Sequence, residues 1–339
     1  MEKIKLGIVG FGFMGHCDAD MMATFDDIDL VAVADTNPEQ LKDAPEGVET
    51  YANIDEMLAN ADINVVMVST PNPSHPEMVK KAAAAKKHVI CEKPAAMSVA
   101  EYDEIFTVHQ QRRWDKDYRI MKEVYDKSMV GDMYIIKSQL YGVNGNMHDW
   151  HIYPEMGGGM LYDWGVHLID QMLDMVKSKI VSLYADVQNV INENVDDYFK
   201  IIMKFENGVT AEIELGTYYL TPKRAWFIGG NKGSALIDGF AGEGKIVRTA
   251  HLLENVPGKI TMTAAGPTRS FGPPEPGLLS EEPLPEVNVD HRNYFEHFLK
   301  AFNGEEDIII KPEQVRRVLC VMDAVRESAK TGKAIAFEE

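Results

Sequence analysis

The chain has 339 residues, of which 45% are hydrophobic and 26% are charged, an ordinary composition for a soluble globular protein. A chain of this length is expected to divide into two domains of comparable size. The formal net charge of −19, from 34 basic and 53 acidic residues, argues against a nucleic-acid partner, because such a surface needs clustered lysines and arginines.

The cysteines and the apolar runs indicate where the protein resides. Cys17, Cys91 and Cys320 are far apart and have no metal-binding spacing, so we expect reduced thiols. No segment has the ~20 apolar residues of a membrane helix. The first apolar run follows two lysines, as in a signal peptide, but the polar His16 and Asp18 interrupt it. The sequence predicts a cytoplasmic protein without a membrane partner.

The first 90 residues alternate short apolar runs with longer amphipathic stretches. Runs of almost entirely apolar residues are typical of strands covered on both faces, and the intervening stretches have helical periodicity. The expected strands are 4–9, 30–34, 65–69 and 88–91, and the expected helices include 55–60 and 76–87. This alternation predicts a doubly wound parallel sheet with right-handed crossovers.

A glycine motif follows the first predicted strand and opens a helix. Its six residues are Gly10, Phe11, Gly12, Phe13, Met14 and Gly15. The glycines allow a tight turn, close approach of a pyrophosphate and close helix packing, and the helix N-terminus attracts the phosphates. Asp35 ends the second predicted strand, where its carboxylate can bind a ribose 2′-hydroxyl and repel a 2′-phosphate. The motif favours NAD over NADP, although a glycine-rich turn with an acidic strand end also occurs without a cofactor.

The fourth predicted strand ends in Glu92-Lys93-Pro94. Open α/β sheets bind ligands at this carboxyl edge, where the Lys93 ammonium could stabilise a developing alkoxide. The alternative is a solvated surface lysine. Only about eleven residues, 95–105, then precede the strand-like run 106–109, and a parallel crossover usually needs a dozen or more. Either the crossover is truncated or the sequence joins two segments across a gap, and we favour the gap.

The second half has a different pattern. Long, partly alternating runs cover 134–141, 180–190, 197–205 and 209–218, and an Asn207-Gly208 turn joins the last two. We expect an α/β domain with a large open, mostly antiparallel sheet, covered by helices on one face and free for a partner on the other. Residues 266–286 contain six prolines and are expected to form a surface excursion. A final helix is expected over 312–331.

Three glycines at 157–159 lead into a predicted helix over 161–170 that carries Asp163 and His167. With Asp170 and Asp174 these residues recur on one helical face. Histidine is suited to accept a hydroxyl proton near neutral pH, and Asp163 lies one turn away. The alternatives are a solvated helix face or a metal site, and without further ligands in the pattern we expect no metal.

The stretch before the glycines mixes aromatic and hydrogen-bonding residues, as sugar-binding sites do. An ordinary loop is nearly as good an interpretation. The candidates are Tyr141, Asn144, His148, Asp149, Trp150 and His151. His291 and Tyr294 are further candidates from the C-terminal part of the chain.

Taken in order, these motifs resemble the Gfo/Idh/MocA oxidoreductase family. The resemblance rests on the glycine motif, Thr70-Pro71-Asn72 with His75, Glu92-Lys93-Pro94, and the glycine triplet leading to Asp163 and His167. It implies a Rossmann domain followed by an α/β domain with an open sheet, and NAD(P)-dependent oxidation of a ring hydroxyl on sugars or inositols. By resemblance, Lys93, Asp163 and His167 are catalytic and the Lys93–Pro94 peptide is cis.

The resemblance also assigns further contacts. It implies cofactor contacts from Thr70, Pro71, Asn72, His75, Glu92, Lys93, Arg113 and Trp114, although Arg112 or Arg113 could instead form ion pairs at the domain junction. The candidate substrate contacts are Lys93, Tyr141, His148, Trp150, Asp163 and His167.

We therefore expect an NAD-binding domain over 1–120 and a substrate-binding and oligomerisation domain over 121–339, whose last helix could pack back on the first domain. The expected reaction transfers hydride between NAD and a ring hydroxyl or ketone of a sugar, glycoside or cyclitol, in a homodimer or homotetramer formed through the second sheet. Two alternatives are a redox-neutral glycosidase that retains its NAD and a non-enzymatic dinucleotide-sensing protein.

Overall fold

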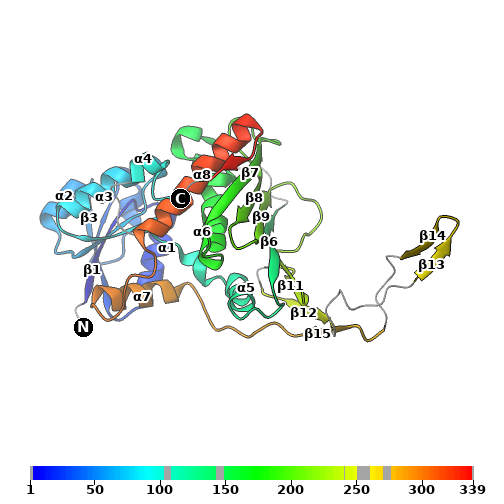
Figure 1. Cartoon of the computed structure of the whole chain (residues 1–339). Helices are drawn as coiled ribbons and strands as arrows, with labels where there is room; N and C mark the ends of the chain where they lie inside the picture. The colour runs from blue at the N-terminus through cyan, green and yellow to red at the C-terminus, as the bar shows by residue number, and fades with distance from the viewer. Residues whose placement is uncertain are drawn as a thin grey trace.

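The computed structural model describes residues 3–102, 108–142, 149–239, 241–249, 260–269 and 276–337. A smaller sheet with its helices, formed by the N-terminal part of the chain, lies beside a larger sheet formed by the second half (Figure 1). Several helices lie between the two sheets, and a thin arm projects from the far end of the larger one. None of the described helices is long and apolar enough to cross a membrane.

The first sheet has five parallel strands in the order β3-β2-β1-β4-β5. The strands are β1 (Ile4–Val9), β2 (Ile28–Ala34), β3 (Glu49–Tyr51), β4 (Val65–Val68) and β5 (His88–Cys91). Their helices are α1 (Phe13–Met22), α2 (Ile54–Asn60), α3 (His75–Ala84) and α4 (Val99–Tyr102), with short 3₁₀ turns η1 (Gln40–Asp43) and η2 (Asn72–Ser74). The predicted Rossmann sheet is confirmed. Only β3 was not predicted, because it is three residues long and none of them is fully buried.

The chain returns to this sheet after β5. Val108 forms an isolated parallel bridge to Cys91, and the His109 N–H donates to the Cys91 carbonyl at 2.7 Å. The segment after His109 therefore starts at the carboxyl edge, beside Lys93. Residues 103–107 lie outside the described residues, and with them the choice between a truncated crossover and a gap.

The second sheet has nine strands in the order β15-β12-β11-β10-β6-β9-β8-β7-β16. All its pairs are antiparallel except β6 with β9, so the predicted mostly antiparallel sheet is confirmed. Its strands are β6 (Met133–Tyr141), β7 (Ile180–Gln188), β8 (Tyr198–Phe205), β9 (Thr210–Gly216), β10 (Trp226–Gly230), β11 (Gly233–Ile237), β12 (Gly244–Thr249), β15 (Leu279–Glu282) and β16 (Ile335–Ala336).

The expectation that 266–286 contains no regular element is wrong. Gly266–Arg269 forms β14, which pairs with β13 (Ile260–Thr263), and β15 extends the large sheet beside β12. Of those prolines that the structure describes, only Pro267 falls inside a strand. That strand belongs to an isolated two-stranded ribbon, and edge positions tolerate a missing N–H. The prolines therefore separate short strands instead of preventing them.

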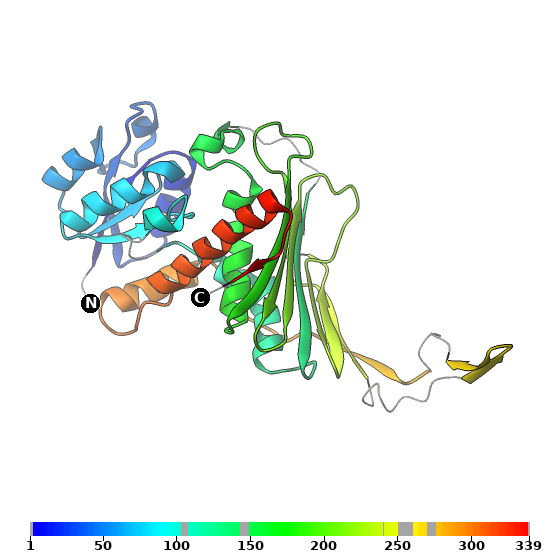
Figure 2. The same ribbon diagram turned by 45° about the horizontal axis from the view of Figure 1, so that its top comes forward.

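Helices cover one face of the large sheet and join it to the first domain (Figure 2). They are α5 (Lys116–Asp126), α6 (Val166–Met175) and α8 (Pro312–Thr331), while α7 (Arg292–Phe302) packs on the first domain through the contact of Phe295 with Phe25. Short 3₁₀ turns η3 (Gln111–Trp114), η4 (Asp149–Ile152) and η5 (Pro154–Met156) lie in the connections, and a π-helical turn, η6 (Leu161–Gly165), precedes α6. The Tyr102 hydroxyl donates to the Pro312 carbonyl at 2.8 Å, so α8 contacts α4 of the first domain.

Candidate active site

The glycine turn between β1 and α1 has the geometry that a bound pyrophosphate requires. Gly10 has φ +87°, and a side chain there would come within 2.6 Å of the Ser69 backbone. A Cβ on Gly15 would lie 2.2 Å from the Gly10 carbonyl oxygen. Gly12 differs, because a Cβ there would have no other atom within 4 Å among the described residues. Two glycines are therefore required for packing, while Gly12 leaves open space above the helix N-terminus, which fits a dinucleotide phosphate.

Asp35 lies at the end of β2 beside this turn. Its carboxylate accepts the Phe11 N–H at 2.8 Å and the Asn37 N–H at 2.7 Å. These bonds hold the acid next to the glycine turn, where the sequence predicts an adenosine ribose. Of the other motif residues, Phe13 is 82% exposed and Met14 is half-buried.

Lys93 follows β5 through a cis Lys93–Pro94 peptide, as the family resemblance implied. Its ammonium donates to the Asp163 carboxylate at 2.7 Å and to the Asp163 carbonyl at 2.9 Å. Both side chains are only partly exposed, at 14% and 18%. On its other oxygen the Asp163 carboxylate lies 3.7 Å from Nε2 of His151. An ammonium from the first domain thus meets a carboxylate at the start of the helical segment of the second.

His167, one turn after Asp163, is buried. Its Nδ1 donates to Oε1 of Gln110 at 3.0 Å, which leaves Nε2 with the lone pair in the neutral ring. Burial lowers the pKa of His167 well below its ordinary value, and the charges of Lys93 and Arg112 lower it further. The imidazole is therefore neutral at physiological pH and able to accept a proton.

The remaining predicted residues of the first domain surround the same edge. His75 is buried, with Nδ1 2.8 Å from the Pro94 carbonyl and Nε2 2.7 Å from the Thr70 carbonyl. The Asn72 amide donates to the Gly157 carbonyl at 3.4 Å, and Pro71, between Thr70 and Asn72, is the N-cap of the η2 turn. His75 and Asn72 therefore tie the Thr70 loop to Pro94 and to the glycine triplet of the second domain.

Arg113 and Trp114 face the domain junction. The Arg113 guanidinium donates to both oxygens of Asp170 at 2.7 Å and lies 3.6 Å from Asp174. Trp114 is buried, with its ring 5.8 Å from that of Tyr294 on α7. The contacts of Arg113 are ion pairs at the domain junction, the alternative to a cofactor contact that the sequence left open for this residue.

A pocket of about 140 Å³ adjoins the site, and its lining includes Trp164 and Leu168, the neighbours of Asp163 and His167. Tyr141 is also part of the lining, and the Arg112 guanidinium lies 3.9 Å from the centre of the Trp164 indole. Trp150 stacks on His151 with 3.8 Å between ring centres. Asn144 and His148 lie outside the described residues.

His291 and Tyr294, the candidates from the C-terminal part of the chain, each have a defined polar contact. Nε2 of His291 lies 2.6 Å from Asp115, and the Tyr294 hydroxyl donates to the Val108 carbonyl at 3.4 Å. His291 lines an open groove with Arg112 and Asp115, while Tyr294 is buried. Neither contact involves Lys93, Asp163 or His167.

Three polar residues near the site were not predicted from the sequence. Gln110 holds His167, and its own Nε2 has no hydrogen-bond partner among the described residues. Asp18 and His109 are buried beside Glu92. A usable signal existed for two of them, because His109 ends the strand-like run 106–109 and Gln110 directly follows it, so both reach the carboxyl edge of the sheet.

A parallel sheet with an open glycine turn, and a lysine and a histidine from two domains at its carboxyl edge, define a dinucleotide-dependent oxidoreductase of two domains. Residues 4–113 match the family model described as an oxidoreductase family with an NAD-binding Rossmann fold, and residues 118–236 match the GFO/IDH/MocA C-terminal domain. The chain belongs to the Gfo/Idh/MocA oxidoreductase family.

Known proteins resemble the chain over most of its length. A crystal structure of an NAD-binding protein from Listeria innocua is 31% identical with a TM-score of 0.90, covering 99% of this chain and 100% of that one. A myo-inositol 2-dehydrogenase from Thermotoga maritima is 24% identical over 62% of this chain and 68% of its own. A scyllo-inositol 2-dehydrogenase (NADP⁺) from Bacillus subtilis is 23% identical over 100% of this chain and 97% of its own.

Proposed function

We propose that this protein is an NAD-dependent dehydrogenase that interconverts a ring hydroxyl and the ketone of a sugar, glycoside or cyclitol. The observation that carries the proposal is the meeting of Lys93, Asp163 and His167 at the domain junction, beside the edge of the sheet that holds the glycine turn. The inositol dehydrogenases among the relatives support this substrate class.

NAD, when bound, supplies a two-electron acceptor for the hydride that leaves the hydroxyl-bearing carbon. The open space over Gly12 would admit the pyrophosphate, and Asp35 would bind the adenosine ribose. Thr70, Pro71 and Asn72 follow the end of β4 at the same edge, where they would contact the rest of the cofactor. Glu92 would do so only through its backbone, because its carboxylate is buried and bonded to His109. Tyr141 and Trp150 would contact the substrate.

The two catalytic side chains divide the work on the substrate oxygen. The Lys93 ammonium has three N–H donors, and Asp163 occupies two of them, so one is left to donate to the substrate oxygen. Nε2 of His167 accepts the hydroxyl proton while the C–H bond breaks, and it returns the proton in the reductive direction. Asp163 fixes the position of the ammonium.

The preference for NAD rests on Asp35. A carboxylate held by the Phe11 and Asn37 N–H groups would lie beside a 2′-phosphate and repel it. The Asp35→Asn variant keeps an acceptor oxygen for one of these two N–H groups and removes the charge. We expect the preference for NAD over NADP to fall by about 10- to 100-fold, measured as the ratio of dissociation constants. An unchanged ratio would contradict the assignment.

The decisive test is a screen of inositols, hexoses and glycosides with NAD and NADP, followed by the absorbance of NADH. The proposal expects NADH in stoichiometric yield from at least one ring polyol. His167→Asn and Lys93→Met should each lower turnover by about 10²- to 10⁴-fold while they keep NAD affinity within a few-fold. Hydrolysis of a glycoside without net NADH would favour the redox-neutral glycosidase, and NAD binding without any turnover would favour a sensor.

A further inference from the structure

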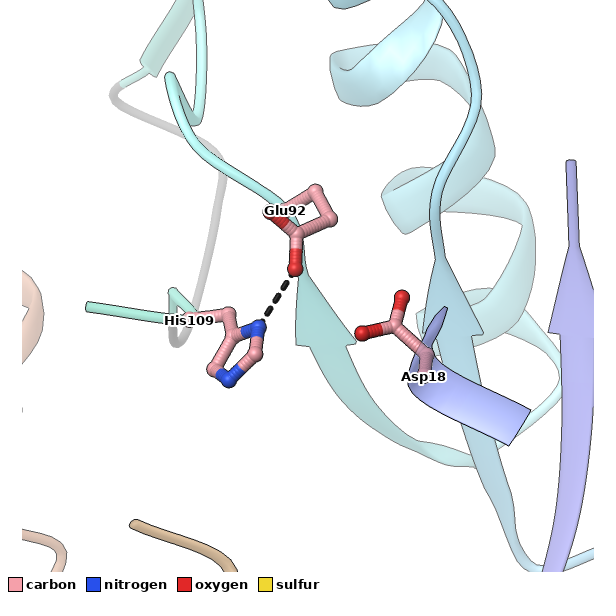
Figure 3. A group of neighbouring side chains, drawn as sticks. All are labelled: Asp18, Glu92 and His109. Carbon is pink, nitrogen blue, oxygen red and sulfur yellow. Dashed lines mark hydrogen bonds and ion pairs between the residues drawn. The ribbon is translucent and has the colours of Figure 1, made fainter. Parts of the chain in front are cut away.

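A second group of ionisable side chains lies buried behind the catalytic lysine. Asp18 comes from the middle of α1, Glu92 directly follows β5, and His109 follows the bridge at Val108. All three are at most 4% exposed, and one ligand atom from each lies within 4.8 Å of the other two. Figure 3 shows His109 turned toward Glu92 with the Asp18 carboxylate facing both.

The internal contacts of this Asp18–Glu92–His109 cluster indicate proton sharing and not metal ligation. Nδ1 of His109 donates directly to Glu92, so an ion between these atoms would have to force them apart. Asp18 accepts the Ser69 hydroxyl at 2.8 Å. Nε2 of His109 has no hydrogen-bond partner among the described residues, and the ring packs 4.6 Å from that of Tyr294.

Each member of the cluster is adjacent to a segment that carries the proposed site. Glu92 precedes Lys93, which holds Asp163. His109 precedes Gln110, which holds His167. The Glu92–His109 bond, together with the backbone bond from His109 to Cys91, therefore joins the segments that present the two catalytic side chains.

Asp18 connects the same point to the cofactor turn. It lies one turn after Gly15 on α1, and its partner Ser69 precedes the Thr70 loop. Movement of Asp18 relative to Glu92 would therefore also move the glycine turn relative to Lys93.

The charges of the cluster depend on pH. Burial and the neighbouring Glu92 carboxylate raise the pKa of Asp18 to about 7. Burial alone would lower the pKa of His109, but the Glu92 carboxylate outweighs it and raises this pKa, and the same ion pair lowers the pKa of Glu92 against its burial. The other titratable groups that interact with these three include Cys17, His75, Cys91, Lys93 and His167, and the Tyr294 ring packs on His109. Above neutral pH two buried carboxylates therefore face each other.

We propose that Asp18 and His109 are positioning residues, which couple the cofactor turn to Lys93 and His167 through Glu92. The purpose of this coupling rests on the proposed function. Its physical basis is independent of that function, because the contacts within the cluster exist without a ligand. When Asp18 is ionised, its carboxylate repels that of Glu92 and loosens the contact between the segments that carry the cofactor turn, Lys93 and His167. When Asp18 is neutral, these segments stay together.

The primary test follows the His167 ring by NMR in the ligand-free protein, so it needs neither cofactor nor substrate. In the wild type the His167 signals should shift with an inflection near pH 7, transmitted from Asp18. Asp18→Asn keeps the bond to Ser69, removes the charge and should abolish the inflection. Asp20→Asn, an exposed acid on the same helix, is the matched control and should keep it. An inflection that persists in Asp18→Asn, or none in the wild type, overturns the proposal.

A second measurement separates positioning from simple folding. NAD affinity of the wild type should weaken by about 3- to 10-fold between about pH 6 and about pH 8.5, and in Asp18→Asn it should stay constant. His109→Gln retains a donor to Glu92 and should lower kcat by about 10-fold with little change in KM, whereas His109→Ala should also lose thermal stability. Stoichiometric binding of Zn²⁺ or Mn²⁺ to the wild type but not to Asp18→Asn would overturn the proposal in favour of a metal site. A chain that oxidises no polyol but shows the His167 inflection would refute the proposed function alone.

Discussion

The environment of the His167 imidazole decides its protonation. Burial and the cations Lys93 and Arg112 disfavour the imidazolium, and the bond from Nδ1 to Gln110 selects the tautomer with a free lone pair on Nε2. Because the neutral ring is the proposed base, protonation of His167 should lower turnover when the pH drops through its lowered pKa. The acid limb of the kcat/KM profile for oxidation is therefore expected below about pH 6.5, the ordinary pKa of histidine.

Replacement of Lys93 tests this electrostatic arrangement directly. Lys93→Met removes one of the charges that disfavour the imidazolium, so the pKa of His167 should rise toward its ordinary value. The measurement is an NMR titration of labelled histidines, with His167→Asn used for assignment. Lys80→Met, an exposed lysine on α3, should leave the titration of His167 unchanged. A pKa that stays the same or falls in Lys93→Met would show that Lys93 does not face His167.

The glycine turn illustrates how one short element combines folding and binding. Gly10 has a positive φ and no room for a side chain, while Gly12 has open space where a side chain would extend. Gly10→Ala should therefore lower the free energy of unfolding by about 1–3 kcal/mol, from backbone strain and overlap.

Gly12→Val should leave the unfolding midpoint within about 2 °C, because the new side chain enters open space. The same change should weaken NAD binding by at least about 10-fold, since the side chain occupies the space proposed for the pyrophosphate. Thermal and urea denaturation and NAD titration of both variants check the contrast. Equal loss of stability in the two variants would mean that Gly12 also serves packing.

At the level of elements, the sequence predicted what its local patterns encode. The apolar runs of β1, β2, β4 and β5 and the alternating runs of β6 to β9 were found, because a strand covered on two faces or on one leaves a distinct pattern. The strands β10 to β12 were not predicted. They contain Gly229, Gly230 and Gly233, and glycines weaken the strand signal.

The residues of the site also divide into those that local sequence patterns predict and those that they do not. Lys93, Asp163 and His167 could be predicted from strand-end and helix positions together with the family resemblance. The hydrogen bond from His167 to Gln110 joins residues 57 apart in sequence, and carboxylate oxygens of Asp18 and Glu92 lie within 4.8 Å of each other although α1 and β5 are far apart in the chain. Such contacts depend on tertiary packing, and local spacing does not specify them.

The junction between the two domains depends on a buried ion pair. Arg113 in η3 bonds to both oxygens of Asp170 on α6, and its remaining nitrogen donates to Gln314 on α8 at 3.2 Å. Arg113→Met leaves a buried carboxylate without this partner, so the free energy of unfolding should fall by about 3–5 kcal/mol. The double variant Arg113→Met/Asp170→Asn should recover part of that loss. Denaturation of the three proteins measures both effects.

This experiment also separates the two roles of Arg113 that the sequence left open. If Arg113 only holds the domains together, its substitution should change the free energy of unfolding much more than the affinity for NAD. The affinity is measured under conditions where the variant is folded. A small loss of stability combined with an affinity for NAD weaker by about 10-fold would instead support direct contact with the cofactor.

The large sheet has an outer face that none of the described helices covers (Figure 2). Tyr184, Ile202 and Glu212 lie opposite one another on its neighbouring strands, and Tyr184 is 41% exposed. The same face carries ion pairs, such as that of Glu212 with Lys137 at 3.1 Å. Mixed apolar and charged surfaces of this kind suit an interface between folded subunits, so we propose that copies of the chain associate through this face as a dimer or tetramer.

Tyr184→Glu tests this proposal, because it places a charge where the outer faces of two copies would meet. A carboxylate buried in an interface without a partner costs several kcal/mol, so the variant should be monomeric at micromolar concentration where the wild type is a dimer or tetramer. Light scattering coupled to size-exclusion chromatography gives both masses. Ala59→Glu adds the same charge on the exposed side of α2 and should keep the wild-type mass. If both variants keep it, the outer face does not hold the subunits together, and association must use another surface.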